Sequence, residues 1–285
     1  MSTTSTDQTE RGSTPRGEGD ALIDRREHPL ARRVTDVLRS RNQGRNLFLI
    51  DDEENILQAV RAGVRLDSLF LSDTARADDA AAAARRAGIP VYRLPDAVSK
   101  DLFGVERHAR VFAIARDPRR ATLGDLVDRS GDVVVLDGVR LAGNIGAITR
   151  TARALGAAGI VLLDSGMNSV LDRRLIRASR GLVFTLPVVL SKPAELQRHL
   201  REQEIPLVTL AADGTEHLED ISHIPGRVAL VMGSERTGAS RRLNEVATHK
   251  LAIPMVPEVE SLNVSVATAL ALWERRRARS GPSSG

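Results

Sequence analysis

The feature that most constrains the fold is a strand-length run that is apolar at successive positions. Residues 132–136 read Asp-Val-Val-Val-Leu. Side chains alternate between the two faces of a strand, so this run must be covered on both sides, as the strands of a parallel sheet are. Helical stretches separate most of the further apolar runs, which cover residues 159–163, 184–190, 206–210, 228–232 and 250–253. This alternation predicts an α/β fold with a mostly parallel sheet and helices on both of its faces.

A smaller α/β unit is predicted ahead of this sheet. Strands are expected over 47–50, 69–71, 90–93 and 111–115, and helices over 53–62 and 77–87. The first 28 residues are polar and charged, which predicts a disordered tail. The predicted division is therefore a tail over 1–28, a first domain over 29–118, a linker over 119–131, a second domain over 132–279 and a flexible tail over 280–285.

The composition excludes several functional classes. The chain has no cysteine, which rules out disulfides and thiolate chemistry, and its six histidines lack ligand spacing, so no metal site is predicted. No apolar run is long enough to span a membrane, and the polar, acid-containing N-terminus is not a secretory signal. We therefore expect a cytoplasmic protein with no membrane partner. Lysine occupies only three of the 41 basic positions. A GC-rich genome explains that bulk excess of arginine, so local clusters must carry any nucleic-acid prediction.

Three segments of the second domain have residues suited to ligand binding. Residues 143–150 (Gly-Asn-Ile-Gly-Ala-Ile-Thr-Arg) open a helix after a strand, where glycines let the backbone approach a ligand. Their spacing argues against the dinucleotide fingerprint G-x-G-x-x-G. Residues 230–238 run from a strand into a turn with two glycines and a glutamate, and residues 253–267 form a loop that enters a helix. Ser261 or Asn263 would cap that helix well, but capping does not account for the whole loop.

Together, the three segments resemble the SpoU-type (TrmH-like) RNA 2′-O-methyltransferases. That family carries N-x-G-x-x-x-R, G-x-E-x-x-G and I-P-M…S-L-N-V-S-V-A in this order. The chain has all three, as Asn144-Ile-Gly146…Arg150, Gly233-Ser-Glu235…Gly238 and Ile253-Pro-Met255…Ser261-Leu-Asn-Val-Ser-Val-Ala267. Segments 102–110, 132–138 and 172–181 look like the thiostrepton-resistance subgroup, so the resemblance extends over roughly residues 30 to 278.

The resemblance implies a fold and an activity. Members have a deep trefoil knot in the C-terminal domain, bind S-adenosylmethionine there and work as homodimers, with an N-terminal RNA-binding domain that is similar to a ribosomal protein. The implied reaction is methylation of the ribose 2′-hydroxyl of an adenosine in 23S ribosomal RNA, which gives resistance to thiostrepton-type thiopeptide antibiotics. Two alternatives stay open: the same chemistry on another ribosomal nucleotide or on transfer RNA, and a non-catalytic RNA-binding protein.

The resemblance also assigns site residues. The implied catalytic group is Arg150 with Asn144, Glu235, Ser261 and Asn263. The implied cofactor-binding residues are Leu210, Gly233, Ser234, Glu235, Ile253, Ser261 and Leu262. A guanidinium is essentially never neutral in a protein, so we expect Arg150 to grip an RNA phosphate and assist the forming alkoxide rather than act as a base.

Two arginine clusters are the predicted RNA contacts. The denser one contains Arg173, Arg174, Arg177 and Arg180, and the other contains Arg107, Arg110, Arg119 and Arg120. Arg177 and Arg180 are one helical turn apart, so both can face the same phosphate. The alternative is that these arginines form a solvated basic surface with no ligand.

Overall fold

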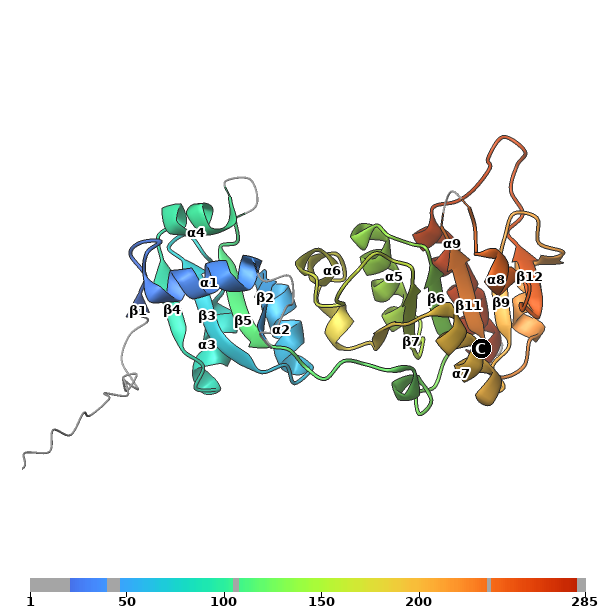
Figure 1. Cartoon of the computed structure of the whole chain (residues 1–285), viewed down its shortest axis with the longest axis horizontal. Helices are drawn as coiled ribbons and strands as arrows, with labels where there is room; N and C mark the ends of the chain where they lie inside the picture. The colour runs from blue at the N-terminus through green and yellow to red at the C-terminus, as the bar shows by residue number, and fades with distance from the viewer. Residues whose placement is uncertain (1–20, 40–46, 105–107, 235–236, 281–285) are drawn as a thin grey trace, which may run out of the picture.

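The computed structural model describes residues 21–39, 47–104, 108–234 and 237–280 (Figure 1). Within them, the first domain contains a five-stranded sheet with the order β1-β4-β3-β5-β2. The strands are β1 (Ala21–Leu22), β2 (Leu47–Asp51), β3 (Leu66–Ser72), β4 (Val91–Leu94) and β5 (Val111–Arg116). Its helices are α1 (Pro29–Arg39), α2 (Glu53–Arg61), α3 (Asp78–Arg86) and α4 (Asp96–Phe103). Strand β5 runs antiparallel to both of its neighbours, β2 and β3.

The structure differs from the prediction at the start of the first domain. Residues 21–22, which were expected in the tail, pair with β4 in parallel register, and the next residue, Ile23, is fully buried. Removing this isoleucine from water stabilises the short edge strand, although the apolar run of residues 21–23 is too short to give a clear signal in the sequence. Helices α1 and α4 were also not predicted.

The second domain is built on a seven-stranded sheet among the described residues, with the order β10-β12-β9-β11-β6-β7-β8. The strands are β6 (Val133–Asp137), β7 (Gly159–Leu163), β8 (Val188–Leu190), β9 (Leu207–Leu210), β10 (Glu216–His217), β11 (Ala229–Gly233) and β12 (His249–Ala252). Every neighbouring pair is parallel. The longer helices are α5 (Ala142–Ala154), α7 (Pro193–Glu202) and α9 (Val264–Ser280), and the shorter ones are α6 (Arg173–Ala178) and α8 (Arg241–Asn244).

Alternate residues of β6 face two different cores, which confirms the predicted α/β class with helices on both faces of the sheet. Val134 and Leu136 join a cluster with residues of α5 and α9. Val133 and Val135 join a second cluster with residues of α7 and α8. The predicted knot and the likeness of the first domain to a ribosomal protein stay predictions, as do the domain limits.

The expected strand over residues 184–190 begins only at Val188. Residues 182–184 instead form a 3₁₀ turn, because Gly181 has a φ of +74° and redirects the chain after α6. The amide of Gly181 donates to the carbonyl of Ile176 at 2.9 Å, which closes the helix. As a result, Phe184 packs against Phe48 of the first domain, with ring centroids 5.9 Å apart.

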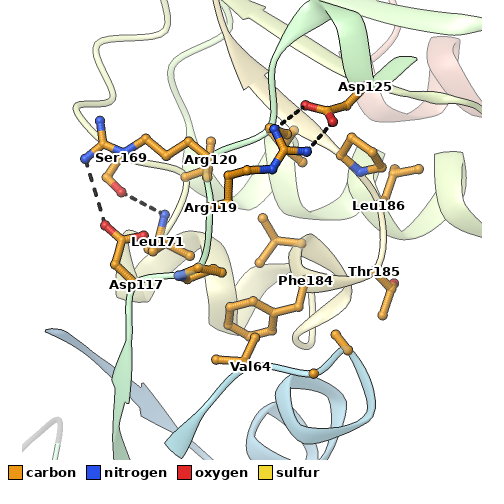
Figure 2. Close-up of a pocket in the computed structure, with 18 of the residues that line it drawn as sticks. Val64, Asp117, Arg119, Arg120, Asp125, Ser169, Leu171, Phe184, Thr185 and Leu186 are labelled. Atoms are coloured by element: carbon orange, nitrogen blue, oxygen red, sulfur yellow. Dashed lines mark hydrogen bonds and ion pairs between the residues drawn. The ribbon is translucent and has the colours of Figure 1, made fainter. Parts of the chain in front are cut away.

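The two domains touch along one side and enclose a cavity on the other. Figure 1 shows α6 between the first domain and α5. On the linker side, a cavity of about 580 Å³ separates Val64 of the first domain from Leu186 of the second (Figure 2). The linker arginines Arg119 and Arg120 line this cavity, and each pairs with a nearby carboxylate, Arg119 with Asp125.

Candidate active site

The carboxyl ends of β9, β11 and β12 meet at one edge of the second sheet, where open parallel sheets bind ligands. A cavity of about 240 Å³ lies there. Among the residues that line it are Leu210, Gly233, Ser234, Ile253, Ser261 and Leu262. These are all of the predicted cofactor-binding residues that the structure describes; Glu235 lies outside the described residues. Segments that are far apart in the sequence therefore converge on one cavity.

The turn after β11 closes tightly on itself. The amide of Ser234 donates to the carbonyl of Gly238 at 3.1 Å, and the amide of Gly238 donates back at 2.9 Å. A Cβ on Gly233 would overlap the carbonyl carbon of Gly238, which has a φ of +64°. Both motif glycines are thus required by the turn itself. The carboxylate of Asp137 accepts a 2.6 Å hydrogen bond from the amide of Ser240, which ties the end of the turn to β6.

Asn263 has two roles in the structure. Its Oδ1 accepts hydrogen bonds from the amide of Ser265 at 2.9 Å and from the Ser265 hydroxyl at 2.6 Å, so it caps α9. Its Nδ2 donates to Oδ1 of Asn144, in the first turn of α5, at 3.4 Å. Asn263 therefore caps α9 and can also act as a motif residue, because its amide side chain joins the start of α9 to the start of α5.

Gly146 packs against α6, so its place in the segment 143–150 is explained by helix packing. It is buried, and a Cβ there would overlap the Cβ of Ala178 at the end of α6. The glycine allows α5 and α6 to approach closely. Helix α5 begins at Ala142, so Asn144 lies within its first turn rather than in a loop.

Arg150 lies on the exposed face of α5. Within the described parts of the chain, no hydrogen bond or ion pair engages its side chain, and none joins it to Ser261 or Asn263. The neighbouring Thr149 is buried and donates to the carbonyl of Ile145 at 2.8 Å. An exposed guanidinium beside this buried position of α5 is available to a phosphate or a ribose.

The predicted arginine cluster of α6 faces carboxylates. Nε of Arg173 donates to Oδ2 of Asp51 at 2.6 Å, and its guanidinium lies 4.6 Å from the centroid of the Phe103 ring. Arg174 instead pairs with Asp172, the N-cap of α6, through two hydrogen bonds of 3.0 and 2.8 Å. These bonds hold the pKa of Asp172 below its ordinary value. Arg173 is therefore engaged within the protein, whereas the Arg174 side chain is 78% exposed, so a phosphate can compete with Asp172 for it.

The other two arginines of the cluster are also exposed. Arg177 lies 3.6 Å from Asp51 and 3.4 Å from Asp52, and Arg180 lies 3.9 Å from Glu54. Both side chains are about half exposed, so an RNA phosphate can compete for them. In the first domain, Arg110 is exposed, and Arg107 lies outside the described residues.

Asp51 is the residue that sequence reasoning missed. It ends β2, and its side chain is only 1% exposed. Burial raises the pKa of this carboxyl, and the nearby Arg173 opposes that rise. The only local signal was a carboxylate ending an apolar strand, and nothing in the sequence linked it to an arginine more than a hundred residues away.

Neither a membrane span nor a metal cluster is found in the described part of the chain. Its helices lack the combination of length and apolarity needed to cross a bilayer. The same residues contain no group of three or more histidine, aspartate or glutamate side chains placed to hold a metal ion.

The fold and the convergence of the three motifs define an RNA-modifying enzyme class, and the chain belongs to the SpoU rRNA methylase family. The model of that family matches residues 132–273. A second family model, the N terminus of the thiostrepton-resistance methylases, matches residues 20–129 and places the chain in that subgroup. The 23S rRNA (adenosine(1067)-2′-O)-methyltransferase of Streptomyces laurentii is 44% identical over 259 residues, which are 90% of this chain and 96% of the relative.

Solved structures agree with this assignment. The AdoMet-bound rRNA methyltransferase of Sinorhizobium meliloti is 25% identical, with a TM-score of 0.77 over 91% of this chain and 98% of that one. The SpoU methyltransferase AviRb of Streptomyces viridochromogenes, solved with the cofactor AdoMet, is 25% identical, with a TM-score of 0.74 over 87% and 97%. The similarity covers both domains.

Proposed function

We propose that this protein transfers the methyl group of S-adenosylmethionine to the ribose 2′-hydroxyl of an adenosine in 23S ribosomal RNA. Such methylation would confer resistance to thiostrepton-type thiopeptides. The observation that carries the proposal is the 44% identity to an adenosine-specific enzyme along nearly the whole of both chains. We place the activity in the cytoplasm, where ribosomal RNA is found.

The test is to incubate the protein with labelled S-adenosylmethionine and naked 23S ribosomal RNA and to map the methyl group. We expect one 2′-O-methyladenosine. Methylation of guanosine alone or of transfer RNA alone would favour the alternative substrates, and binding without transfer would favour a non-catalytic RNA-binding protein.

The residues at the cavity fit S-adenosylmethionine. Leu210, Ile253 and Leu262 offer apolar contact for a purine, and the tight turn at Gly233 leaves main-chain groups within reach of a ligand. When bound, the cofactor supplies a methyl group already activated on its sulfonium, so the transfer itself calls for no metal. Ser261, which also lines the cavity, would hydrogen-bond near the reacting groups.

The protein's own residues must hold the ribose and stabilise the negative charge that forms on its 2′-oxygen. The planar guanidinium of Arg150 would bind the adjacent phosphate through two hydrogen bonds and stabilise the forming alkoxide. The Asn144–Asn263 contact fixes the first turn of α5 and therefore the helix that carries Arg150. We assign Glu235 the same orienting role on the strength of the family motif.

An apolar stripe on α9 supports a homodimer. Val266, Leu270 and Trp273 recur at i, i+4 and i+7, so they share one helical face, and Trp273 is 55% exposed. Leu141, at the start of the neighbouring α5, is 64% exposed. Exposed apolar side chains grouped in this way are typical of protein–protein interfaces.

Leu270→Asp should convert the dimer into monomers, because it places a charge in the centre of the stripe. Light scattering at micromolar concentration measures the change. Val246→Asp is the matched control, since Val246 is similarly exposed but lies outside the stripe. A wild-type monomer, or a Leu270→Asp variant that remains dimeric, would contradict this assignment.

RNA affinity should fall steeply with salt, because arginine–phosphate contacts release counterions. We expect at least about a tenfold loss between about 50 and 200 mM salt, and Arg110→Ala should lower the slope of log affinity against log salt by about 1. Cofactor affinity should not change. Arg241→Ala is the control, since Arg241 begins α8, lies outside both arginine clusters and pairs with Glu245. A nearly salt-independent affinity would mean that the arginine clusters are solvated surface.

A further inference from the structure

Helix α6 carries a buried ion pair between the two domains. Arg173 begins α6, and its partner Asp51 ends β2 of the first domain. The carboxylate is almost fully buried, and the guanidinium is covered on one side by Phe103. Removing one member of a buried pair leaves the other charge uncompensated, so this contact resists separation of the domains more than a surface pair would.

A steric contact on the same side is independent of charge. Gly181 follows α6 with a φ of +74°, and a Cβ there would lie 2.8 Å from the Cβ of Gln58 and 3.1 Å from the Cα of Asn55. Both of these residues belong to α2 of the first domain. The chain after α6 therefore lies against α2 at a distance that only glycine allows.

The opposite side of α6 is equally close to the catalytic helix. Gly146 of α5 leaves no room for a Cβ beside Ala178, so α6 and α5 are packed backbone to backbone. Helix α5 also carries Asn144 and Arg150. The linker side, in contrast, is open, with the cavity of about 580 Å³ beneath residues 117–121 (Figure 2). The contacts of α6, rather than the linker, thus set the angle between the domains.

We propose that Asp51 and Gly181 are positioning residues. Through α6, they hold the first domain in a fixed place relative to α5, so that ribosomal RNA bound by that domain presents its target ribose beside Arg150. This inference rests on the proposed function. Its physical basis is that a displacement of about 1 Å from the reactive geometry can cost about a hundredfold in rate.

The first test removes the charge. Asp51→Asn should lower kcat for 23S ribosomal RNA at least about tenfold, while the affinities for RNA and S-adenosylmethionine stay within about twofold, because the variant misplaces the ribose without removing a binding group. Asp52→Asn is the matched control. Asp52 is adjacent and exposed, and its φ of +68° is one that asparagine tolerates. Its kcat should stay within about twofold of wild type.

The second test opens the same interface sterically and does not depend on how well Asp51→Asn folds. Gly181→Ala should reproduce the loss of kcat. Gly88→Ala is its control: Gly88 has a φ of +67°, so the backbone strain is similar, but a Cβ there meets nothing within 4 Å. Its kcat should stay near wild type.

Small-angle X-ray scattering gives a readout that does not require activity. Asp51→Asn and Gly181→Ala should both show an increased radius of gyration, and the two controls should not.

If both interface variants keep wild-type kcat and wild-type scattering, the positioning role is wrong while the proposed function stands. If wild-type protein transfers no methyl group to ribosomal RNA, the proposed function fails, and scattering still decides whether these residues dock the domains. An increased radius of gyration in the two interface variants without a loss of kcat would also overturn the proposal.

Discussion

Replacing Arg150 with alanine is expected to lower methyl transfer by at least about a hundredfold, the size seen when a positioned catalytic group is lost. S-adenosylmethionine should still bind with nearly wild-type affinity, because Arg150 is not among the residues that line the cofactor cavity. Single-turnover transfer to 23S ribosomal RNA and calorimetric titration of the cofactor measure the two effects separately. A loss that appears only in cofactor affinity would contradict the proposed role.

Arg150→Lys separates geometry from charge. Lysine keeps the positive charge but loses the planar pair of donors. If the guanidinium grips phosphate and assists the hydroxyl together, lysine should be almost as impaired as alanine. A lysine variant that retains most of the activity would show that charge alone suffices. Arg153→Lys, one turn further along α5, is the matched control and should stay close to wild type.

Gly233→Ala is expected to weaken S-adenosylmethionine binding by about thirtyfold. The new Cβ would overlap the carbonyl carbon of Gly238, so the turn must open and its two backbone hydrogen bonds, each worth about 1 kcal/mol, are lost. The distortion reaches Ser234, which also lines the cavity. Equilibrium binding of the cofactor measures the effect, and thermal unfolding checks that the domain remains folded.

The control for this substitution is Gly124→Ala. Gly124 lies in the linker, and a Cβ there would meet only the Thr122 hydroxyl oxygen at an ordinary 3.6 Å. Its cofactor affinity should equal that of wild type. Wild-type affinity in a folded Gly233→Ala variant would instead mean that the cofactor does not depend on this turn.

The sheet of the second domain was predictable because its signals are local. An apolar run such as residues 132–136 must be buried on both faces, whichever elements cover it. The structure places β6 there, with a core on each side. The residues around the cavity at Gly233 were named from the family motifs. The structure brings them together because each of their segments follows the carboxyl end of a strand, and parallel strands bring those ends to one edge.

Elements with weak local signals were missed. In α1, the buried side chains of Ala31, Val34 and Val37 are separated by arginines and polar residues, so the apolar stripe is narrow. The two-residue strands β1 and β10 are too short to produce a pattern of alternating polarity. Burial in the folded protein, as at Ile23, decides whether such segments become ordered elements.

The sequence alone determined the fold class and the family, because these depend on residue type and on spacing along the chain. Only the tertiary structure decided what Gly146, Gly181 and Arg173 do. A glycine lets another group come close to the backbone, but the amino-acid sequence does not say whether that group is a ligand or a helix. An arginine likewise attracts any anion. Arg173 is engaged by Asp51 instead of a phosphate because folding brings that buried carboxylate to within 2.6 Å.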